Sequence, residues 1–155
     1  MSEYPLVRPA LVSECDRLTQ MAFESKRAWG YDEQFMERCR GELVVTAREV
    51  ERGNVFVAGD GRQSTALGFY VLLANVGGFA QLDMLFVEPS RWGEGFGARL
   101  WLDAVRLGRL RGAETLRVES DPFAVGFYER LGAVNVGVAT SPSTGRTLPV
   151  LELSL

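Results

Sequence analysis

The sequence predicts an α/β protein in which helices pack against one mixed sheet, and three observations support this fold class. The chain has 155 residues, 46% of them apolar, which is enough for one compact core and too little for two ordinary domains. Short apolar runs typical of strands are interspersed with segments whose apolar residues recur at helical spacing. No internal repeat or flexible linker interrupts this order. We therefore expect a single domain over residues 1–155.

The first half of the chain is predicted to hold a strand, two helices, a helical turn and three further strands. The opening strand alternates apolar and polar residues and stops at Pro9. Gly41 closes the second helix, and Thr46 with Glu49 forms a capping box for the helical turn. In chain order, these elements are predicted at 4–8, 12–28, 33–40, 46–53, 54–59, 65–74 and 79–87.

The predicted strand at 65–74 is apolar on both faces, which suits a central position in a sheet covered by helices. Asp60-Gly61 and Gly77-Gly78 are turn signals before and after it. Its most apolar part, residues 66–74, is far shorter than the roughly 20 residues that span a bilayer. We therefore expect a buried strand and no membrane partner.

The second half of the chain is predicted to contain two helices and three strands. Asp121-Pro122 is a favourable start for the second helix, in which Phe123, Phe127 and Leu131 repeat every four residues. The first helix is amphipathic, with Phe96, Leu100, Ala104 and Leu107 on one face and Arg99, Asp103, Arg106 and Arg109 on the other. The strands are predicted at 115–119, 133–139 and 148–153, with a loop at 141–146 between the last two.

The composition argues against several classes of chemistry. The chain has no histidine, so Ser-His and Cys-His nucleophile systems and histidine metal ligands are excluded. With 17 Lys+Arg against 20 Asp+Glu, the net charge is -3, and no basic block matches a nucleic-acid backbone. Cys15 and Cys39 form no Cys-x-x-Cys pattern, and no charged-then-apolar signal segment opens the chain. We expect free thiols in the cytoplasm, no metal and no nucleic-acid partner.

A glycine-rich segment at residues 92–98, Trp-Gly-Glu-Gly-Phe-Gly-Ala, carries the main functional signal. It lies where a strand ends and a helix begins, so free backbone N–H groups and the helix dipole converge there. Glycine lets phosphate oxygens reach these donors. A Walker loop is excluded because Gly-Lys-Ser/Thr is missing, and a dinucleotide fold because the segment lies two-thirds through the chain. The segment is either a pyrophosphate site or a plain tight turn.

Three motifs, taken together in this order, resemble the GNAT family of N-acetyltransferases over nearly the whole chain. They are Val7-Arg8-Pro9-Ala10, Leu85-Phe86-Val87-Glu88-Pro89 and the stretch 124–133, Ala-Val-Gly-Phe-Tyr-Glu-Arg-Leu-Gly-Ala. The family's loop is usually Arg/Gln-x-x-Gly-x-Gly/Ala, so Gly95 and Gly97 match it and Trp92 departs from it. The resemblance implies a mostly antiparallel sheet with splayed central parallel strands flanked by helices.

The resemblance also implies that acetyl-CoA is the cosubstrate. In the family, the strand matching 85–87 pairs with the pantetheine amides, and the glycine loop binds the pyrophosphate mainly through backbone N–H groups. The implied cofactor contacts are Leu85, Phe86, Val87, Trp92, Gly93, Glu94, Gly95, Phe96, Gly97, Ala98, Asp121 and Phe127. Arg99, Arg106, Arg109 and Arg111 either attract the CoA phosphates or form a solvated helix face.

Tyr128 matches the family's tyrosine that protonates the departing thiolate after an amine attacks directly through a tetrahedral intermediate. With an unperturbed pKa of about 10, a tyrosine keeps its proton at neutral pH. The alternative is a packed helix tyrosine. Because Phe127 and not Tyr128 continues the apolar stripe of the last helix, we favour the catalytic role. A backbone N–H in the stretch 84–86 is the candidate to polarise the thioester carbonyl, since the family's strand is commonly bulged there.

The base is open between Asp83, Glu119 and water. Asp83 is a carboxylate inside an apolar strand, which is costly unless it binds something or faces a cleft. In many family members the base matches Gln81, on the same strand face, so Asp83 either removes the proton or orients a cationic amine. Glu119, at the end of the next strand, is a weaker candidate because its position also suits a solvated residue.

The resemblance places the acceptor, a small-molecule or peptide amine, near Trp29, Tyr31 and Gln81. Trp29 and Tyr31 either line a pocket or seal the core. The predicted function is N-acetyl transfer from acetyl-CoA to this amine. The alternative is a non-catalytic acyl-CoA-binding or sensing module, because a fold does not establish an activity. Family habit also allows a homodimer through the last two strands, although no residue requires it.

Overall fold

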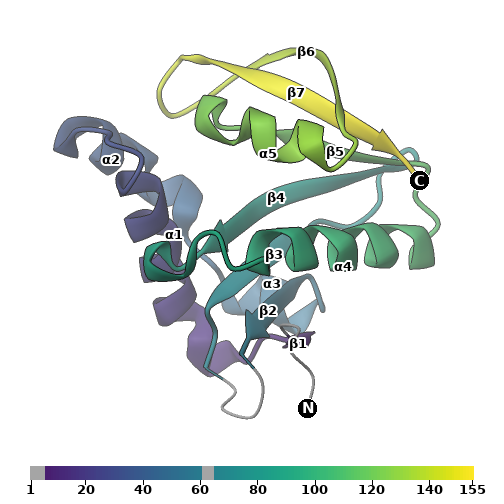
Figure 1. The fold of residues 1–155 in the computed structure, drawn as a ribbon, viewed down its shortest axis with the longest axis horizontal. Coiled ribbons are helices and arrows are strands. Elements are labelled where there is room, and N and C mark those ends of the chain that lie inside the picture. Colours follow the sequence, from purple (N-terminus) through teal and green to yellow (C-terminus); the bar gives the residue numbers. More distant parts are fainter. Residues whose placement is uncertain (1–5, 61–64) are drawn as a thin grey trace.

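The computed structural model describes residues 6–60 and 65–155, and its strands form a seven-stranded sheet in the order β1-β2-β3-β4-β5-β7-β6 (Figure 1). The predicted strand start at Tyr4 and the turn residue Gly61 lie outside the described residues. The strands are β1 (Leu6–Pro9), β2 (Val55–Gly59), β3 (Gly68–Leu72), β4 (Phe79–Val87), β5 (Thr115–Glu119), β6 (Val134–Thr140) and β7 (Thr147–Ser154). The helices are α1 (Cys15–Arg27), α2 (Glu33–Cys39), α3 (Ala47–Glu51), α4 (Phe96–Leu110) and α5 (Val125–Arg130), with 3-10 turns η1 (Val12–Glu14), η2 (Arg40–Leu43), η3 (Pro89–Arg91) and η4 (Pro122–Ala124).

The sheet is mixed, and its parallel pair lies at the centre, which confirms the predicted fold class. β4 and β5 run parallel, and the other described neighbours run antiparallel. The parallel pairing extends only from Phe79 opposite Thr115 to Leu82 opposite Val118. Beyond Leu82 the two strands diverge, on the side of α1 and α2 in Figure 1. This divergence creates the space in which the site is built.

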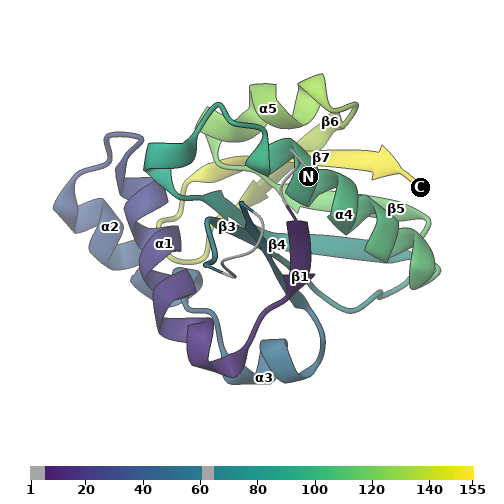
Figure 2. The same cartoon turned by 60° about the horizontal axis from the view of Figure 1, so that its bottom comes forward.

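Two apolar cores hold the helices on opposite faces of the sheet. Leu100 and Trp101 of α4 pack with sheet residues such as Leu82, and Tyr128 of α5 joins the same core. Leu18 of α1 packs in the second core with α2 and the other face of β3. Figure 2 shows α1 and α2 on one side of the molecule and α4 on the other.

The central strand β3 is buried on both faces, as predicted, but it is shorter than the predicted 65–74. The residues just before and after β3 are not part of the strand, but they still form backbone hydrogen bonds to the neighbouring strands. The Leu67 N–H donates to the Ala58 carbonyl, and the Leu73 N–H donates to the Gln81 carbonyl. The apolar run therefore exceeds the strand because Leu67 and Leu73 lie in partly buried loops next to it, while Thr65 and Ala74 are exposed.

Two helix predictions were wrong in detail. α2 ends at Cys39, one residue before the predicted Arg40, but Gly41 does not stop the helical path, which continues as η2 to Leu43, a residue only 4% exposed. Burial of this leucine in the core continues the helical path by a tighter turn. Asp103 does not lie on a solvated face of α4. It is buried, and the Tyr70 hydroxyl donates to its Oδ2 at 2.7 Å.

The described residues hold no helix long and apolar enough to cross a membrane. Within residues 6–60 and 65–155, no group of three or more His, Cys, Asp or Glu side chains is placed to hold a metal ion. Cys15 and Cys39 are free thiols.

Candidate functional site

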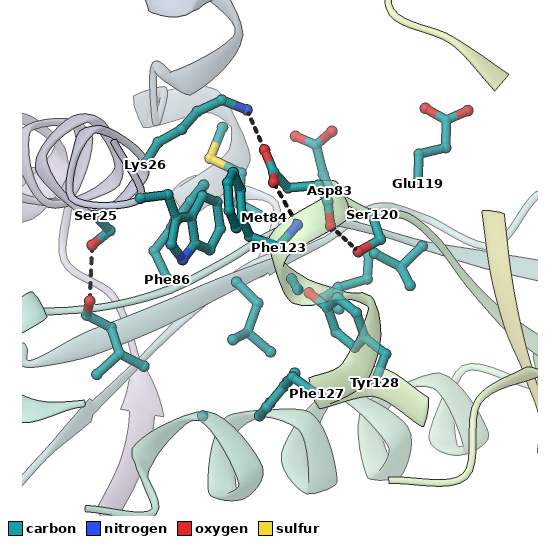
Figure 3. Close-up of a pocket in the computed structure, with 18 of the residues that line it drawn as sticks. Ser25, Lys26, Asp83, Met84, Phe86, Glu119, Ser120, Phe123, Phe127 and Tyr128 are labelled. Carbon is teal, nitrogen blue, oxygen red and sulfur yellow. Dashed lines mark hydrogen bonds and ion pairs between the residues drawn. The ribbon is translucent and has the colours of Figure 1, made fainter. Parts of the chain in front are cut away.

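A cleft of about 800 Å³ opens where β4 and β5 diverge (Figure 3). Its walls come from β4, the glycine loop with the start of α4, the end of β5, α5, α1 and the β6–β7 loop. The predicted site residues that line it are Trp29, Asp83, Leu85, Phe86, Val87, Trp92, Gly93, Gly95, Phe96, Gly97, Ala98, Glu119, Asp121, Phe127 and Tyr128. Three residues predicted for the site, Tyr31, Gln81 and Glu94, lie outside this lining.

The glycine loop presents unpaired backbone N–H groups beside the cleft. Gly93 and Gly95 have φ values of 84° and 91°, in the left-handed region that favours glycine. In the described part of the chain, no hydrogen-bond acceptor meets the backbone N–H groups of residues 93–98. A Cβ added at Gly95 would meet no atom within 4 Å, so no side chain fills the space beside it. The loop therefore has the donors and the room of an anion site at a helix N-terminus.

Trp92 fastens the glycine loop to the end of β4. Its indole Nε1 donates to the Val87 carbonyl oxygen at 2.8 Å, and Ser25 Oγ of α1 donates to the same oxygen at 2.8 Å. The Trp92 ring lies 6.4 Å from the Trp29 ring, which lies 6.0 Å from the Phe123 ring. These aromatic contacts connect both walls of the cleft, so tryptophan has a structural role where the family usually has arginine or glutamine.

β4 carries a β-bulge centred on Asp83. Val71 of β3 pairs with Met84, whereas Leu72 pairs with Leu82, so Asp83 is the extra residue. Leu82 packs in the core under α4 and Met84 in the core under α1, which shows that the alternation of side chains reverses at the bulge. Residues 83–87 of β4 also have no pairing partner in β5, because the pairing of the two strands ends at Leu82. The bulge predicted near 84–86 is therefore present, one position earlier.

Three carboxylates line the part of the cleft next to this bulge. Asp83 is open to the cleft, but protein atoms surround much of its carboxyl. This partial desolvation raises the pKa of the carboxyl, and the negative charges of Glu49, Glu119 and Glu42 raise it further. Glu119 ends β5, and Glu42 comes from η2. Figure 3 shows the Asp83 and Glu119 carboxylates on the same side of the cleft. Among the described residues, Asp83 and Glu119 form no ion pair with a lysine or arginine.

Tyr128 is buried and still faces the cleft. It is 5% exposed, and its ring lies 5.3 Å from the Trp101 ring and 5.1 Å from the Phe127 ring. No described residue hydrogen-bonds its hydroxyl, which points toward the middle of the cleft in Figure 3. Burial, together with the charge of Asp121, raises the pKa of the Tyr128 hydroxyl above its ordinary value. This hydroxyl is thus a protonated donor without an acceptor among the described residues.

The predicted apolar stripe of the last helix holds for Phe127 and Leu131, which pack against the core, and is wrong for Phe123. Phe123 is 61% exposed, Phe127 lines the cleft, and Tyr128 is the residue of α5 that enters the core. The segment begins with the 3-10 turn η4, whose tighter winding shifts the phase of the residues that follow. Phe127 packs instead against α4, where a Cβ added at Gly97 would lie 3.1 Å from its ring. Tyr128 thus packs in the core, as the alternative interpretation predicts, and also lines the cleft, and its catalytic role stays a prediction.

A buried charge network forms another part of the cleft wall, and sequence reasoning missed most of it. The Asp121 carboxylate is 7% exposed and accepts from the Tyr31 hydroxyl at 2.8 Å and from Arg146 Nη2 at 2.8 Å. Lys26 Nζ lies 3.4 Å from the same carboxylate. Asp121 also caps η4 through the Phe123 N–H. Both oxygens of this predicted cofactor contact are therefore already engaged by protein.

The pKa values of this network follow from its contacts. Burial alone would raise the pKa of Asp121, but the donors from Phe123, Arg146 and Tyr31 and the charge of Lys26 hold it below its ordinary value. Burial raises the pKa of Tyr31 to about 12. Tyr31 therefore stays protonated and serves as a structural donor to Asp121.

The arginines of α4 that have described partners make structural contacts. Arg106 pairs with Asp103 at 3.2 Å. Arg111, just after α4, donates to the Leu72 carbonyl at 3.2 Å and to Asn54 Oδ1 at 2.9 Å. Because the glycine loop is at the N-terminal end of α4, Arg111 lies at the far end of the helix from it. Arg99 is in the first turn and is exposed.

A profile of the acetyltransferase (GNAT) family matches residues 15–133. No curated protein sequence matches the chain. Several solved structures have a similar fold. A GCN5-related N-acetyltransferase from Rhodopseudomonas palustris has 23% identity and a TM-score of 0.76, with 100% of this chain and 99% of that chain covered.

Two further structures were solved with coenzyme A. The PaiA N-acetyltransferase from Thermoplasma acidophilum has 19% identity and a TM-score of 0.75, with 98% of this chain and 99% of that chain covered. A Bacillus subtilis acetyltransferase has 18% identity and a TM-score of 0.69, with the same coverage. At these identities the similarity concerns the fold.

Proposed function

Because the chain belongs to the GNAT family of acetyltransferases, we propose that it transfers an acetyl group from acetyl-CoA to the amine of a small molecule or peptide. The amine attacks directly, through a tetrahedral intermediate. One observation carries the proposal: a single cleft joins the unpaired N–H groups of the glycine loop to the unpartnered hydroxyl of Tyr128. Acetyl-CoA supplies the activated thioester, and the residues of the chain supply binding and proton transfer.

The cleft fits the cofactor at two places. The N–H groups of residues 93–98 would hold the pyrophosphate, because they have no acceptor among the described residues, none of which fills the space beside Gly95. The edge of β4 at residues 83–87 is unpaired toward β5, so its backbone groups would pair with the pantetheine amides. Phe127, packed on Gly97, would form an apolar wall between them.

Tyr128 would protonate the departing thiolate. Its raised pKa keeps the hydroxyl protonated at neutral pH, and no described side chain competes for that proton. On the acceptor side, the raised pKa of Asp83 makes it a better base than an ordinary aspartate, so it would remove the amine proton or orient the amine. Glu119 and water remain the alternatives for the base step.

The proposal predicts that Tyr128→Phe lowers kcat by about 100-fold or more, since general acids contribute that much. Thiol release from acetyl-CoA with a panel of amines measures turnover, and calorimetry measures CoA affinity, which should be unchanged. Tyr70→Phe is the matched control, because it removes a buried hydroxyl bonded to Asp103, outside the cleft lining. That variant should keep its kcat.

Two outcomes separate the alternatives. Unchanged turnover in Tyr128→Phe would reject Tyr128 as the acid and leave the transferase in place. Tight CoA binding without turnover of any amine would favour the non-catalytic acyl-CoA-binding or sensing module. The free thiols Cys15 and Cys39 are compatible with the cytoplasmic location that we also propose. The homodimer stays a prediction.

A further inference from the structure

Two side chains from different elements donate to one carbonyl oxygen at the end of β4. The Trp92 indole Nε1 and the Ser25 Oγ each lie 2.8 Å from the Val87 carbonyl oxygen, and Figure 3 draws the contact from Ser25. Trp92 opens the glycine loop, whereas Ser25 lies on α1 and is only 1% exposed. Because a carbonyl oxygen has two lone pairs, these two donors fill its capacity to accept hydrogen bonds.

The filled carbonyl points to the open edge of β4. The next residue, Glu88, donates its N–H to the Leu67 carbonyl on the β3 side. The backbone groups of successive strand residues point alternately to the two sides of a strand, so Val87 and Leu85 present theirs away from β3. The pairing with β5 ends at Leu82, and both residues line the cleft. Their backbone groups therefore lie at the edge where the cofactor arm would pair.

The two donors remove a second binding register from this edge. Without them, Leu85 and Val87 would offer the same pair of groups, one N–H and one C=O, about 6.7 Å apart along the strand. The amides of a pantetheine arm recognise only backbone groups, so the arm would bind at either residue. A shift by that distance would carry the thioester away from Tyr128. Transfer therefore needs a device that selects one register.

Resting on the proposed function, we propose that Trp92 and Ser25 are positioning residues that fix the register of the pantetheine arm on β4. They occupy the acceptor of Val87, so that of these two edge residues only Leu85 offers both a donor and an acceptor to an amide of the arm. The Val87 N–H stays available for one further contact. Trp92 thus acts on the reaction through the carbonyl that it fills, and neither side chain touches the reacting atoms.

Ser25→Ala frees one lone pair of the Val87 oxygen and so opens the second register. Acetyl-CoA bound there is unproductive, so kcat and KM for acetyl-CoA should both fall by about threefold while kcat/KM stays unchanged. A residue that only stabilises the fold would not produce this parallel change. Trp92→Phe should give the same result, and it tests the proposal independently if Ser25→Ala does not fold.

Thr19→Val is the matched control for Ser25→Ala. The Thr19 hydroxyl also lies on α1 and is also bonded to the backbone, since it accepts from the Val45 N–H at 2.9 Å. Neither of these two residues lines the cleft. Both kinetic constants should therefore be the same as in the wild type.

A second measurement needs no turnover. Labelling with ¹³C in the valine carbonyls and ¹⁵N in glutamate selects, by NMR, the carbonyls of Val50, Val87 and Val118, which each precede a glutamate. In Ser25→Ala, the Val87 carbonyl signal should move in the free protein and return toward its wild-type position when CoA is added. In the wild type, CoA should move it less. Val50, outside the cleft lining, is the internal reference.

Failure of this inference and failure of the proposed function look different. If kcat and KM do not fall together in the folded variants, or if CoA moves the Val87 signal as far in the wild type as in Ser25→Ala, the inference is overturned while the transferase stands. If the Val87 signal behaves as expected but no amine is acetylated, the register device stands and the transferase falls. A wild type that binds no CoA overturns both.

Discussion

The two walls of the cleft are built by different means. One wall, formed by the glycine loop and β4, depends on backbone geometry: Gly93 and Gly95 hold positive φ values, and Asp83 marks the bulge in β4. The other wall, formed by the charge network of Asp121, depends on side chains from distant segments. Arg146 reaches the Tyr31 hydroxyl at 2.7 Å across 115 positions of sequence, and both bind Asp121.

This difference decides how each wall responds to change and how well it can be predicted. A wall made of backbone depends on a short local segment, so a change there alters binding more than folding. A wall made of a buried charge network depends on every member, because removing one leaves its partners desolvated and unpaired. The following predictions test that contrast from the largest expected effect to the smallest.

Asp121→Asn should lower the free energy of unfolding by about 3 kcal/mol, because it leaves Lys26 and Arg146 without their buried counter-charge. Urea denaturation measures the change. Glu94→Gln is the control, since Glu94 also pairs with an arginine, Arg91 at 3.0 Å, but on the exposed glycine loop. It should cost less than about 1 kcal/mol. Equal losses in both variants would contradict a special role for the buried network.

The same network predicts a pH dependence. The folded state holds the pKa of Asp121 below its ordinary value of 3.8, so the ionised form stabilises the fold above that pH. This stabilisation is lost as the pH falls through the lowered pKa. The difference in unfolding free energy between wild type and Asp121→Asn should be constant from about pH 6 to 8 and shrink below about pH 4. A difference that does not change down to pH 3 would contradict the ionic origin.

The sequence predicts the backbone-built wall and most of the fold because their signals are local. Glycines at 93 and 95, the strand-to-helix junction and the central apolar run each lie within a few residues. The charge network has no such signal: the resemblance singles out Asp121 and Tyr31 for ligand contacts, but nothing in the sequence shows that they bind each other or that Arg146 joins them. Tyr128 was favoured as the acid on a helical phase that η4 shifts, and spacing alone does not reveal a 3-10 turn.

Gly95→Ala should weaken CoA binding by about tenfold, because alanine at a φ of 91° costs roughly 1–2 kcal/mol and shifts the N–H groups that the pyrophosphate needs. Gly112→Ala is a matched control. Gly112 has a φ of 78°, also has no atom within 4 Å of an added Cβ, and follows the opposite end of α4. Both variants should lose similar stability, but only Gly95→Ala should lose CoA affinity by calorimetry. Equal affinities would show that the loop does not hold the cofactor.

Asp83→Asn should have the smallest effect on stability and the opposite sign to Asp121→Asn. The folded state raises the pKa of Asp83, so it binds a proton more readily than the unfolded state, and the ionised carboxylate lowers stability at neutral pH. The neutral side chain removes that penalty, and the melting temperature at pH 7 should rise by roughly 1–2 °C. The gain should shrink as the pH falls toward the ordinary pKa of 3.8 and vanish well below it, where the carboxyl is protonated in both states.

Turnover of Asp83→Asn should fall while its stability rises, because the carboxylate is retained at a cost for its role toward the amine. A lower melting temperature at pH 7 would contradict this interpretation and show that a cation holds Asp83 in the folded state. Two aspartates in one cleft should thus have opposite effects on stability: Asp121 is stabilising because the protein supplies its cations, and Asp83 is destabilising because no described lysine or arginine pairs with it.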